Sequence, residues 1–253
     1  MTESERSNAS TAQNDLSVSS TWHVPPVPDE RRVALYALAD EGRAFAEQLI
    51  ATPASIEELQ AATAALRSLR SRLPHRNDVA SEGTSAIERA TSFRDQSPIH
   101  GFGNMLAPHL ALRVVDEHIE GEVTFSAAYE GAPGHVHGGW IAAVFDEVLG
   151  MVQALPGAPG MTGKLEVNYR KPTPLGRPIH VIGHIDRVEG RKIFTSGRSF
   201  DPETGVTYAE STGLFISIDF SRFTSATRPG IVTTWRPDDA EETPPPTLSS
   251  EVS

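Results

Sequence analysis

Residues 137–152 read HGGWIAAVFDEVLGMV, and this stretch decides the fold. Apolar side chains occupy nearly the whole circumference of the helix it would form, which predicts a helix buried inside the protein. Gly138 and Gly139 open that helix and leave backbone N–H groups accessible to a carbonyl oxygen. Asp146 lies among apolar residues, where burial of a carboxylate is costly unless it has a partner or a function. The stretch therefore predicts a central helix that carries chemistry.

Segments with strand character lie on both sides of this helix. Two precede it and four follow it, rich in Val, Ile, Phe and Thr, at residues 110–118, 122–128, 164–170, 179–188, 192–200 and 207–218. Turn signals separate them at Glu120-Gly121, Pro174-Leu175-Gly176, Glu189-Gly190 and residues 201–205. This order predicts an α+β fold in which an antiparallel sheet wraps around the central helix.

The chain divides into four predicted parts. They are a disordered N-terminus, a helical extension with a linker, the main domain and a flexible tail, at residues 1–25, 26–96, 97–220 and 221–253. In the extension, a first helix ends before Pro53. A second begins with a capping box of Ser55 and Glu58 and ends before Pro74.

Composition excludes several classes of protein. The chain has 253 residues, of which 38% are hydrophobic, enough for one sizeable core with an annex. A net charge of -11 argues against nucleic acid or an anionic membrane as a partner. The absence of cysteine excludes disulfides, thiolate-bound zinc and a cysteine nucleophile. With no signal peptide or membrane-spanning run apparent, we expect a soluble cytoplasmic protein.

Several motifs recur in a fixed order along the main domain. They are HGG at 137–139, Asp146, Met161-Thr162, NYRKP at 168–172 with Pro174-Leu175, VEGRK at 188–192 and LFI at 214–216. In this combination residues 131–219 resemble the hotdog-fold acyl-CoA thioesterases, in the branch that includes the human C-terminal modulator protein. The resemblance implies a hotdog fold and hydrolysis of fatty acyl-CoA, with a medium or long acyl chain. It also implies a homodimer or a dimer of dimers. One departure is that Glu130, Gly131 and Ala132 stand where some branches place an asparagine or glutamine.

The spacing of the candidate catalytic residues favours a site shared between two chains. Gly138 and Asp146 are eight residues apart, or about 12 Å along one helix, so one thioester carbonyl cannot touch both. The Gly138 N–H, beside Gly139, would polarise the carbonyl, and His137 would shape the turn. Asp146 would act as general base or as nucleophile. Thr162, which matches the family's threonine, would orient water or hold the carboxylate.

Basic residues near turns are candidates for the phosphates of CoA. Arg170 and Lys171 come first, and Arg191 and Lys192 second, although such residues are often only solvated. No cofactor is expected. No metal site is expected either, because nothing completes a ligand set with His135 and His137.

Other interpretations of the same residues stay open. Asp146 could be a structural carboxylate, Glu147 could be the functional acid, and the glycine pair could only permit close packing. The domain could be a non-catalytic module that binds acyl-CoA or regulates a partner. It could also hydrate enoyl thioesters, if His118, His180 or His184 supplied the acid and base.

Overall fold

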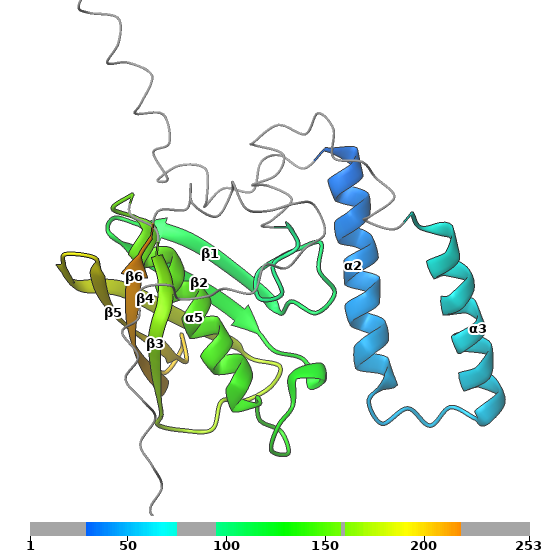
Figure 1. Ribbon diagram of the computed structural model, residues 1–253. Coiled ribbons are helices and arrows are strands. Elements are labelled where there is room, and N and C mark those ends of the chain that lie inside the picture. The colour runs from blue at the N-terminus through cyan, green and yellow to red at the C-terminus, as the bar shows by residue number, and fades with distance from the viewer. Residues whose placement is uncertain (1–28, 75–94, 158–159, 219–253) are drawn as a thin grey trace, which may run out of the picture. The chain divides into compact units, whose positions relative to one another are not determined.

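A computed structural model describes residues 29–74, 95–157 and 160–218 of the chain (Figure 1). All of these residues belong to one unit, formed by residues 1–218. The predicted disordered N-terminus, nearly all of the predicted linker and the predicted tail lie outside the described residues.

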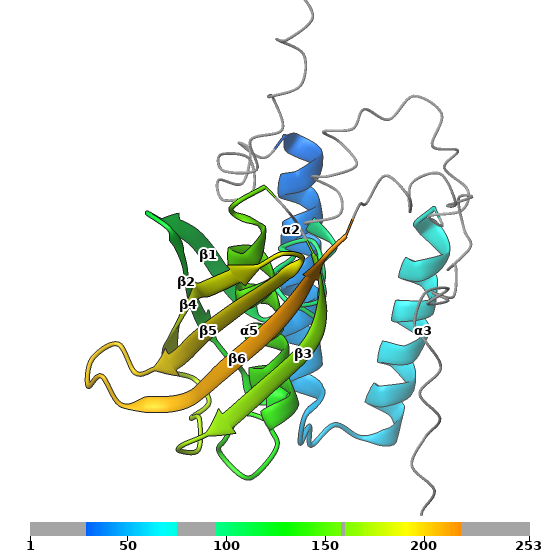
Figure 2. The same cartoon turned by 60° about the vertical axis from the view of Figure 1, so that its left-hand side comes forward.

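Six antiparallel strands form a single sheet in the order β1-β2-β4-β5-β6-β3. They are β1 (His109–Val115), β2 (His118–Thr124), β3 (Gly160–Tyr169), β4 (Pro178–Glu189), β5 (Lys192–Phe200) and β6 (Thr207–Ser217). Figure 2 shows β3 at one edge of the sheet, beside β6. The predicted antiparallel sheet is confirmed, and its edge strands are β1 and β3.

Helix α5 (Gly138–Ala154) lies against one face of the sheet, as Figures 1 and 2 show. Its side chains Phe145, Val148 and Leu149 are 0% exposed and form the centre of the core with inward-facing strand residues. Each such side chain contributes about 1.5–3 kcal/mol through the hydrophobic effect. At Gly183 of β4, an added Cβ would lie 2.8 Å from Val148 Cγ1, so glycine permits the close approach of helix and strand. The central helix of the predicted fold is therefore confirmed.

The apolar sequence of α5 predicted a helix covered on all sides. The single chain leaves part of its surface open. In the single chain Gly139 and Asp146 are exposed, and Ala142, Ala143 and Gly150 are half-buried. These positions recur every three or four residues, so they form one stripe along the helix. The sheet covers the opposite side of α5, which leaves this stripe open. Asp146 therefore carries no burial cost within one chain.

The first hairpin turns at a different place from the one predicted. Its turn is at Asp116-Glu117, and Asp116 adopts a positive φ of 52°, which Asp tolerates better than most residues. Gly121 lies inside β2, where an added Cβ would meet Leu112 Cδ2 at 2.9 Å. The glycine that predicted a turn instead makes room for a neighbouring strand's side chain.

The N-terminal extension contains the two predicted helices, α2 (Glu30–Leu49) and α3 (Ile56–Arg72). The capping box of Ser55 and Glu58 at the start of α3 is present as predicted. On α2, the Tyr36 hydroxyl donates to Asp95 Oδ1 at 2.6 Å, and Arg43 Nη1 donates to the Asn104 carbonyl at 2.6 Å. Helix α2 is thus joined to the segment that precedes β1.

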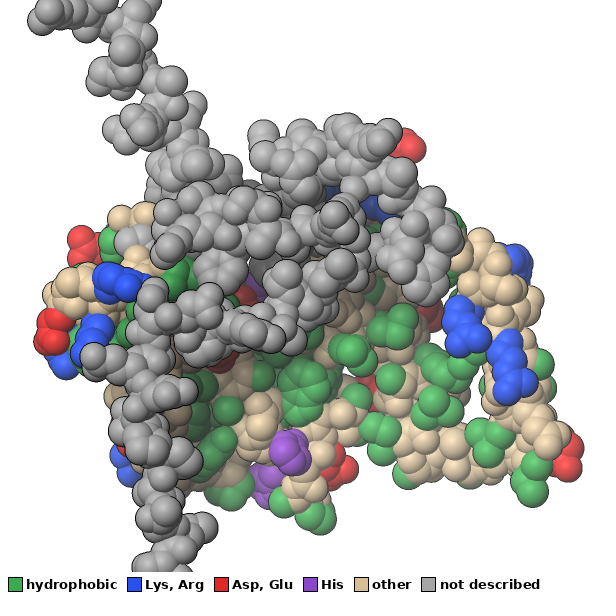
Figure 3. All heavy atoms as spheres, in the orientation of Figure 1, with side chains coloured by type: hydrophobic (Ala, Val, Ile, Leu, Met, Phe, Trp, Pro, Cys, Tyr) green, Lys and Arg blue, Asp and Glu red, His purple; other side chains and the backbone are tan. Residues whose placement is uncertain are grey.

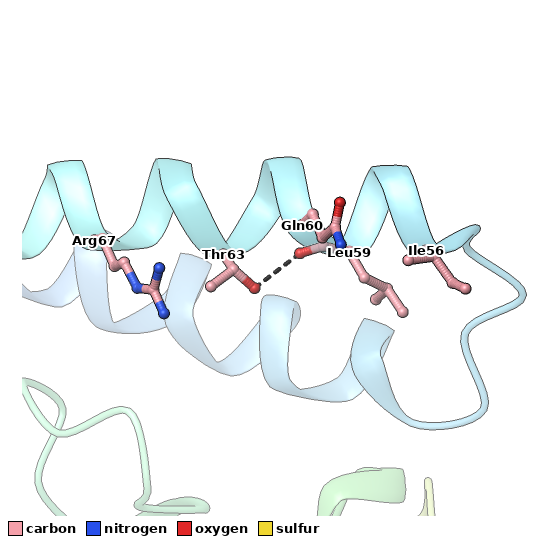
Figure 4. Close-up of a pocket in the computed structure, with 5 residues that line it drawn as sticks. All are labelled: Ile56, Leu59, Gln60, Thr63 and Arg67. Carbon is pink, nitrogen blue, oxygen red and sulfur yellow. Dashed lines mark hydrogen bonds between the residues drawn. The ribbon is translucent and has the colours of Figure 1, made fainter.

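Helix α3 has no buried residue. Figure 4 shows Ile56, Leu59, Thr63 and Arg67 along one side of it, where they line a shallow hollow with Gln60. Basic side chains follow at its C-terminal end, at Arg70 and Arg72, and basic groups are visible along α3 in Figure 3. Within the described ranges, no helix has the length and apolar character needed to cross a bilayer.

Candidate active site

The N-terminus of α5 is fixed by its own capping residue. His137 is the N-cap, and its Nδ1 accepts a hydrogen bond from the Gly139 N–H at 3.0 Å. The His137 N–H donates to the Tyr129 carbonyl at 2.9 Å, which ties the cap to the preceding turn. Among the described residues, no acceptor is recorded for the Gly138 N–H, which as the first helical residue has none within α5. This N–H remains available to an external acceptor.

Aromatic rings support this end of the helix. Tyr129 and Trp140 meet edge to face, with ring centroids 4.9 Å apart. Burial raises the pKa of Tyr129 above its ordinary value, so the phenol keeps its proton and donates to the Leu106 carbonyl at 3.3 Å. The turn before His137 is therefore fixed by packing and by a hydrogen bond.

Asp146 and Thr162 are brought together from two elements. The Thr162 hydroxyl on β3 donates to Asp146 Oδ1 on α5 at 2.8 Å, across sixteen positions of sequence. A register shift between Thr162 and Lys164 interrupts the pairing of β3 with β6 at this point. Thr162 holds one oxygen of the carboxylate, and the other oxygen is open to solvent or to a reactant. Asp146 is therefore an exposed carboxylate whose orientation is fixed.

A second contact joins α5 to β3 at the other end of the site. The Tyr169 hydroxyl donates to the Gly138 carbonyl at 2.7 Å. Tyr169 belongs to the NYRKP motif, for which the sequence predicted no role of its phenol. Strand alternation offered no sign of this contact, because the phenol reaches a residue 31 positions away.

The neighbouring acid Glu147 has a partner of its own. Its Oε1 lies 2.9 Å from His100 Nδ1, and both side chains are largely buried. The geometry falls short of a hydrogen bond, and the contact is an ion pair when His100 is protonated. Glu147 thus faces the segment before β1, whereas Asp146 lies on the open stripe. Nothing in the sequence singled out His100.

The two pairs of candidate phosphate ligands lie in different parts of the sheet: Arg170 and Lys171 follow β3, whereas Arg191 and Lys192 lie at the turn between β4 and β5. Arg170 follows β3 and forms an ion pair with Glu210, with Nη2 and Oε2 2.6 Å apart. Lys171, next to it, is exposed and has no recorded side-chain partner among the described residues. In the sheet, Lys192 of β5 lies opposite Ile216 of β6, and Ile216 lies opposite Met161 near the start of β3. Arg191 donates through Nε to the Ser217 carbonyl at 3.1 Å. One chain does not bring the two basic pairs together.

The three histidines considered for hydration lie on the wrong face of the sheet. In β4, Val181 and Gly183 face α5, so the alternating residues His180 and His184 face away from it. His118 lies beside inward-facing Ile119 in β2 and likewise faces away. Each histidine has a carboxylate partner there: Glu120, Glu122 and Asp186 for His118, His180 and His184. Within one chain, these side chains therefore do not face Asp146.

Across residues 29–74, 95–157 and 160–218, no group of three or more His, Asp or Glu side chains is placed to hold a metal ion. His135 Nδ1 instead contacts the Pro133 carbonyl at 2.8 Å, and His137 caps α5. The hollow on α3 is lined by α3 residues alone and includes none of the candidate catalytic residues.

Known proteins resemble the chain in this region. The sequence profile of the thioesterase superfamily matches residues 133–208, which include His137, Asp146, Thr162 and Tyr169. Acyl-coenzyme A thioesterase THEM4 of Bos taurus is 40% identical over 92 residues, 36% of this chain and 37% of that protein. The Xenopus laevis THEM4 is 36% identical over 89 residues, 35% of this chain and 40% of that protein. The chain thus matches well under two thirds of the length of these curated relatives.

One solved structure matches over most of its length. The thioesterase superfamily protein RHA08564 is 31% identical and aligns with a TM-score of 0.64, over 77% of this chain and 98% of that one. The likeness extends beyond the segment shared with the curated relatives. The chain therefore belongs to the thioesterase superfamily.

Proposed function

We propose that the chain hydrolyses acyl-CoA thioesters to a free acid and CoA. The observation that carries the proposal is the hydrogen bond from Thr162 to Asp146, at 2.8 Å. It holds a carboxylate at an exposed point of α5, on the same helix whose first N–H is open. The curated relatives described above are named acyl-coenzyme A thioesterases, which supports the same chemistry.

The reaction follows from two groups with opposite electrostatic character. The Gly138 N–H and the positive end of the α5 dipole would stabilise the negative charge that develops on the thioester oxygen. Asp146 would take a proton from water as the water oxygen attacks the carbonyl carbon, and the proton would pass to the departing thiolate. Alternatively, the carboxylate itself attacks, and water then cleaves the mixed anhydride. In both courses the C–S bond breaks. In the first CoA leaves as a thiol, and in the second it leaves as a thiolate that takes a proton from solvent, while the water that cleaves the anhydride releases one.

The proposed site is composed of two chains. Gly138 and Asp146 lie about 12 Å apart along α5, too far to act on one carbonyl. The open stripe on α5 and the free edge of β3 offer a second copy a surface next to both residues. In a two-fold dimer, each thioester would meet Gly138 of one chain and Asp146 of the other. A dimer of such dimers would keep the same sites.

The proposed substrate is a medium- or long-chain fatty acyl-CoA, and the proposed setting is cytoplasmic fatty acid metabolism. Of the basic residues, Lys171 is the best placed for a phosphate of CoA, since it is exposed beside the end of β3. Arg170 would have to exchange Glu210 for the ligand. Arg191 and Lys192 lie at the turn between β4 and β5, and a second chain would have to bring them to the same substrate.

Release of free CoA tests the proposal. Wild type and Asp146→Asn are compared on a series of saturated acyl-CoAs from acetyl to palmitoyl. Asparagine keeps the size and can still accept from Thr162, but it is neither base nor nucleophile. We expect wild type to turn over at least one chain length, and the variant to lose roughly a hundredfold or more in kcat. Binding without turnover by wild type would favour a non-catalytic acyl-CoA-binding module instead.

A further inference from the structure

Tyr169 is the strongest unassigned contact at the site. Its hydroxyl donates to the Gly138 carbonyl at 2.7 Å, while the ring lies on the edge strand and is 55% exposed. The contact needs a reason beyond burial of the ring, because the ring is not buried.

The hydrogen bond from Tyr169 helps to fix the peptide group between Gly138 and Gly139. The peptide between Gly138 and Gly139 donates its N–H to His137 Nδ1 at 3.0 Å and accepts from Tyr169 at its carbonyl. Both polar atoms of this peptide are therefore held by side chains. The neighbouring peptide, between His137 and Gly138, keeps its N–H open. Rotation of the first turn, which would redirect that N–H, would break one or both of these hydrogen bonds.

Space at Gly138 is shaped by the same contact. A Cβ added there would meet the Tyr169 oxygen at 3.2 Å and its Cζ at 3.3 Å. The φ of Gly138 is not positive, so backbone conformation alone does not require glycine. The close approach of the phenol is a second reason for glycine at this position, besides access for a thioester.

We infer that Tyr169 is a positioning residue for the oxyanion donor at Gly138. It acts from β3 through the Gly138 carbonyl and does not touch the reacting atoms. The inference rests on the proposed thioesterase function, because only that function uses the Gly138 N–H. A donor that is already oriented stabilises the transition state without reorganisation, so its support affects turnover more than substrate binding.

Kinetics of Tyr169→Phe test the inference on the full chain, with the acyl-CoA that wild type hydrolyses fastest. We expect kcat to fall about tenfold and KM to stay within about twofold, since the loss of a whole oxyanion donor costs more than the loss of its support. Tyr36→Phe is the matched control. It removes the α2 phenol that donates to Asp95 at 2.6 Å, a hydrogen bond that does not involve Gly138, and should leave kcat unchanged. Thermal unfolding checks that both variants fold.

A spectroscopic measurement separates positioning from general loosening. With glycine labelled by ¹⁵N, the amide resonance of Gly139 should shift in Tyr169→Phe, because its peptide loses the hydrogen bond at the carbonyl. Glycine resonances of the β4–β5 region should not move. An unchanged kcat in Tyr169→Phe, with active wild type, would overturn the inference alone. A wild type that releases no CoA from any acyl-CoA would remove the proposed function and the inference with it.

Discussion

At the scale of single residues, the site depends on two hydroxyls that reach α5 from the edge strand. Thr162 holds the carboxylate of Asp146, and Tyr169 holds the carbonyl of Gly138. Neither hydroxyl is buried by its own chain. Each hydroxyl fixes the orientation of a group that the reaction proposed above requires.

Thr162→Val should lower kcat about tenfold. The substitution keeps the shape but removes the donor to Asp146, and a hydrogen bond to a charged group is worth about 1.5–3 kcal/mol. Exposure places the effect near the lower end, and about 1.4 kcal/mol corresponds to a factor of ten in rate. Steady-state CoA release measures it. Thr162→Ser, which retains the hydroxyl, should stay within about threefold of wild type; equal losses in both variants would contradict the assigned role.

The residues of the site differ in how far sequence could reveal them. Gly138 and Asp146 stood out because glycines and a carboxylate interrupt an otherwise apolar helix. Thr162 was identified only through the family resemblance, since a threonine in a strand carries no signal of its own. Tyr169 and His100 were not assigned roles, because both act on residues brought near by tertiary folding. The structure places these side chains, while their catalytic roles stay predictions.

At the scale of elements, close approach of α5 to the sheet limits what β4 can carry. Gly183→Ala should destabilise the protein by about 1–3 kcal/mol, the usual range for overpacking in a core. Its Cβ would lie 2.8 Å from Val148 Cγ1, and Val148 has no room to move because it is 0% exposed. Chemical denaturation measures the loss. His184→Ala, on the other face of the same strand, should change stability by no more than about 0.5 kcal/mol.

Elements followed from sequence wherever periodicity and turn residues agreed. The turns at Gly176, Gly190 and Gly205 all carry glycines with positive φ, and β4, β5 and β6 were predicted nearly to their ends. Strand β3 begins at Gly160, four residues before its predicted start. The prediction of the first hairpin was wrong, because Glu120-Gly121 has the composition of a turn but lies within β2. In the fold Gly121 serves side-chain packing within β2, which local sequence cannot distinguish from a turn signal.

At the scale of the whole molecule, the open stripe on α5 predicts that a second copy of the chain covers it, which can be tested. The apolar character of the helix predicted burial on all sides, and one chain provides it everywhere except along the open stripe. The sequence could not show which side a second copy would have to cover. That choice depends on where the sheet lies and on which strand forms its edge.

Subunit mixing tests whether two chains share each site. Asp146→Asn and Gly138→Val should each be inactive, the second because a side chain there collides with Tyr169. After the two are unfolded together and refolded, half of the dimers should be mixed, each with one intact site. Activity should then return to about a quarter of the wild-type value. Continued inactivity, with mixed dimers shown by native mass spectrometry, would place each site within one chain.

The contact between His100 and Glu147 has a consequence for divergence among relatives. Position 100 lies outside the 133–208 segment that the superfamily profile matches, yet its side chain touches the residue next to Asp146. Sequence change at position 100 therefore acts one residue away from the candidate carboxylate. Selection can alter the surroundings of Asp146 while every motif of the shared domain stays the same.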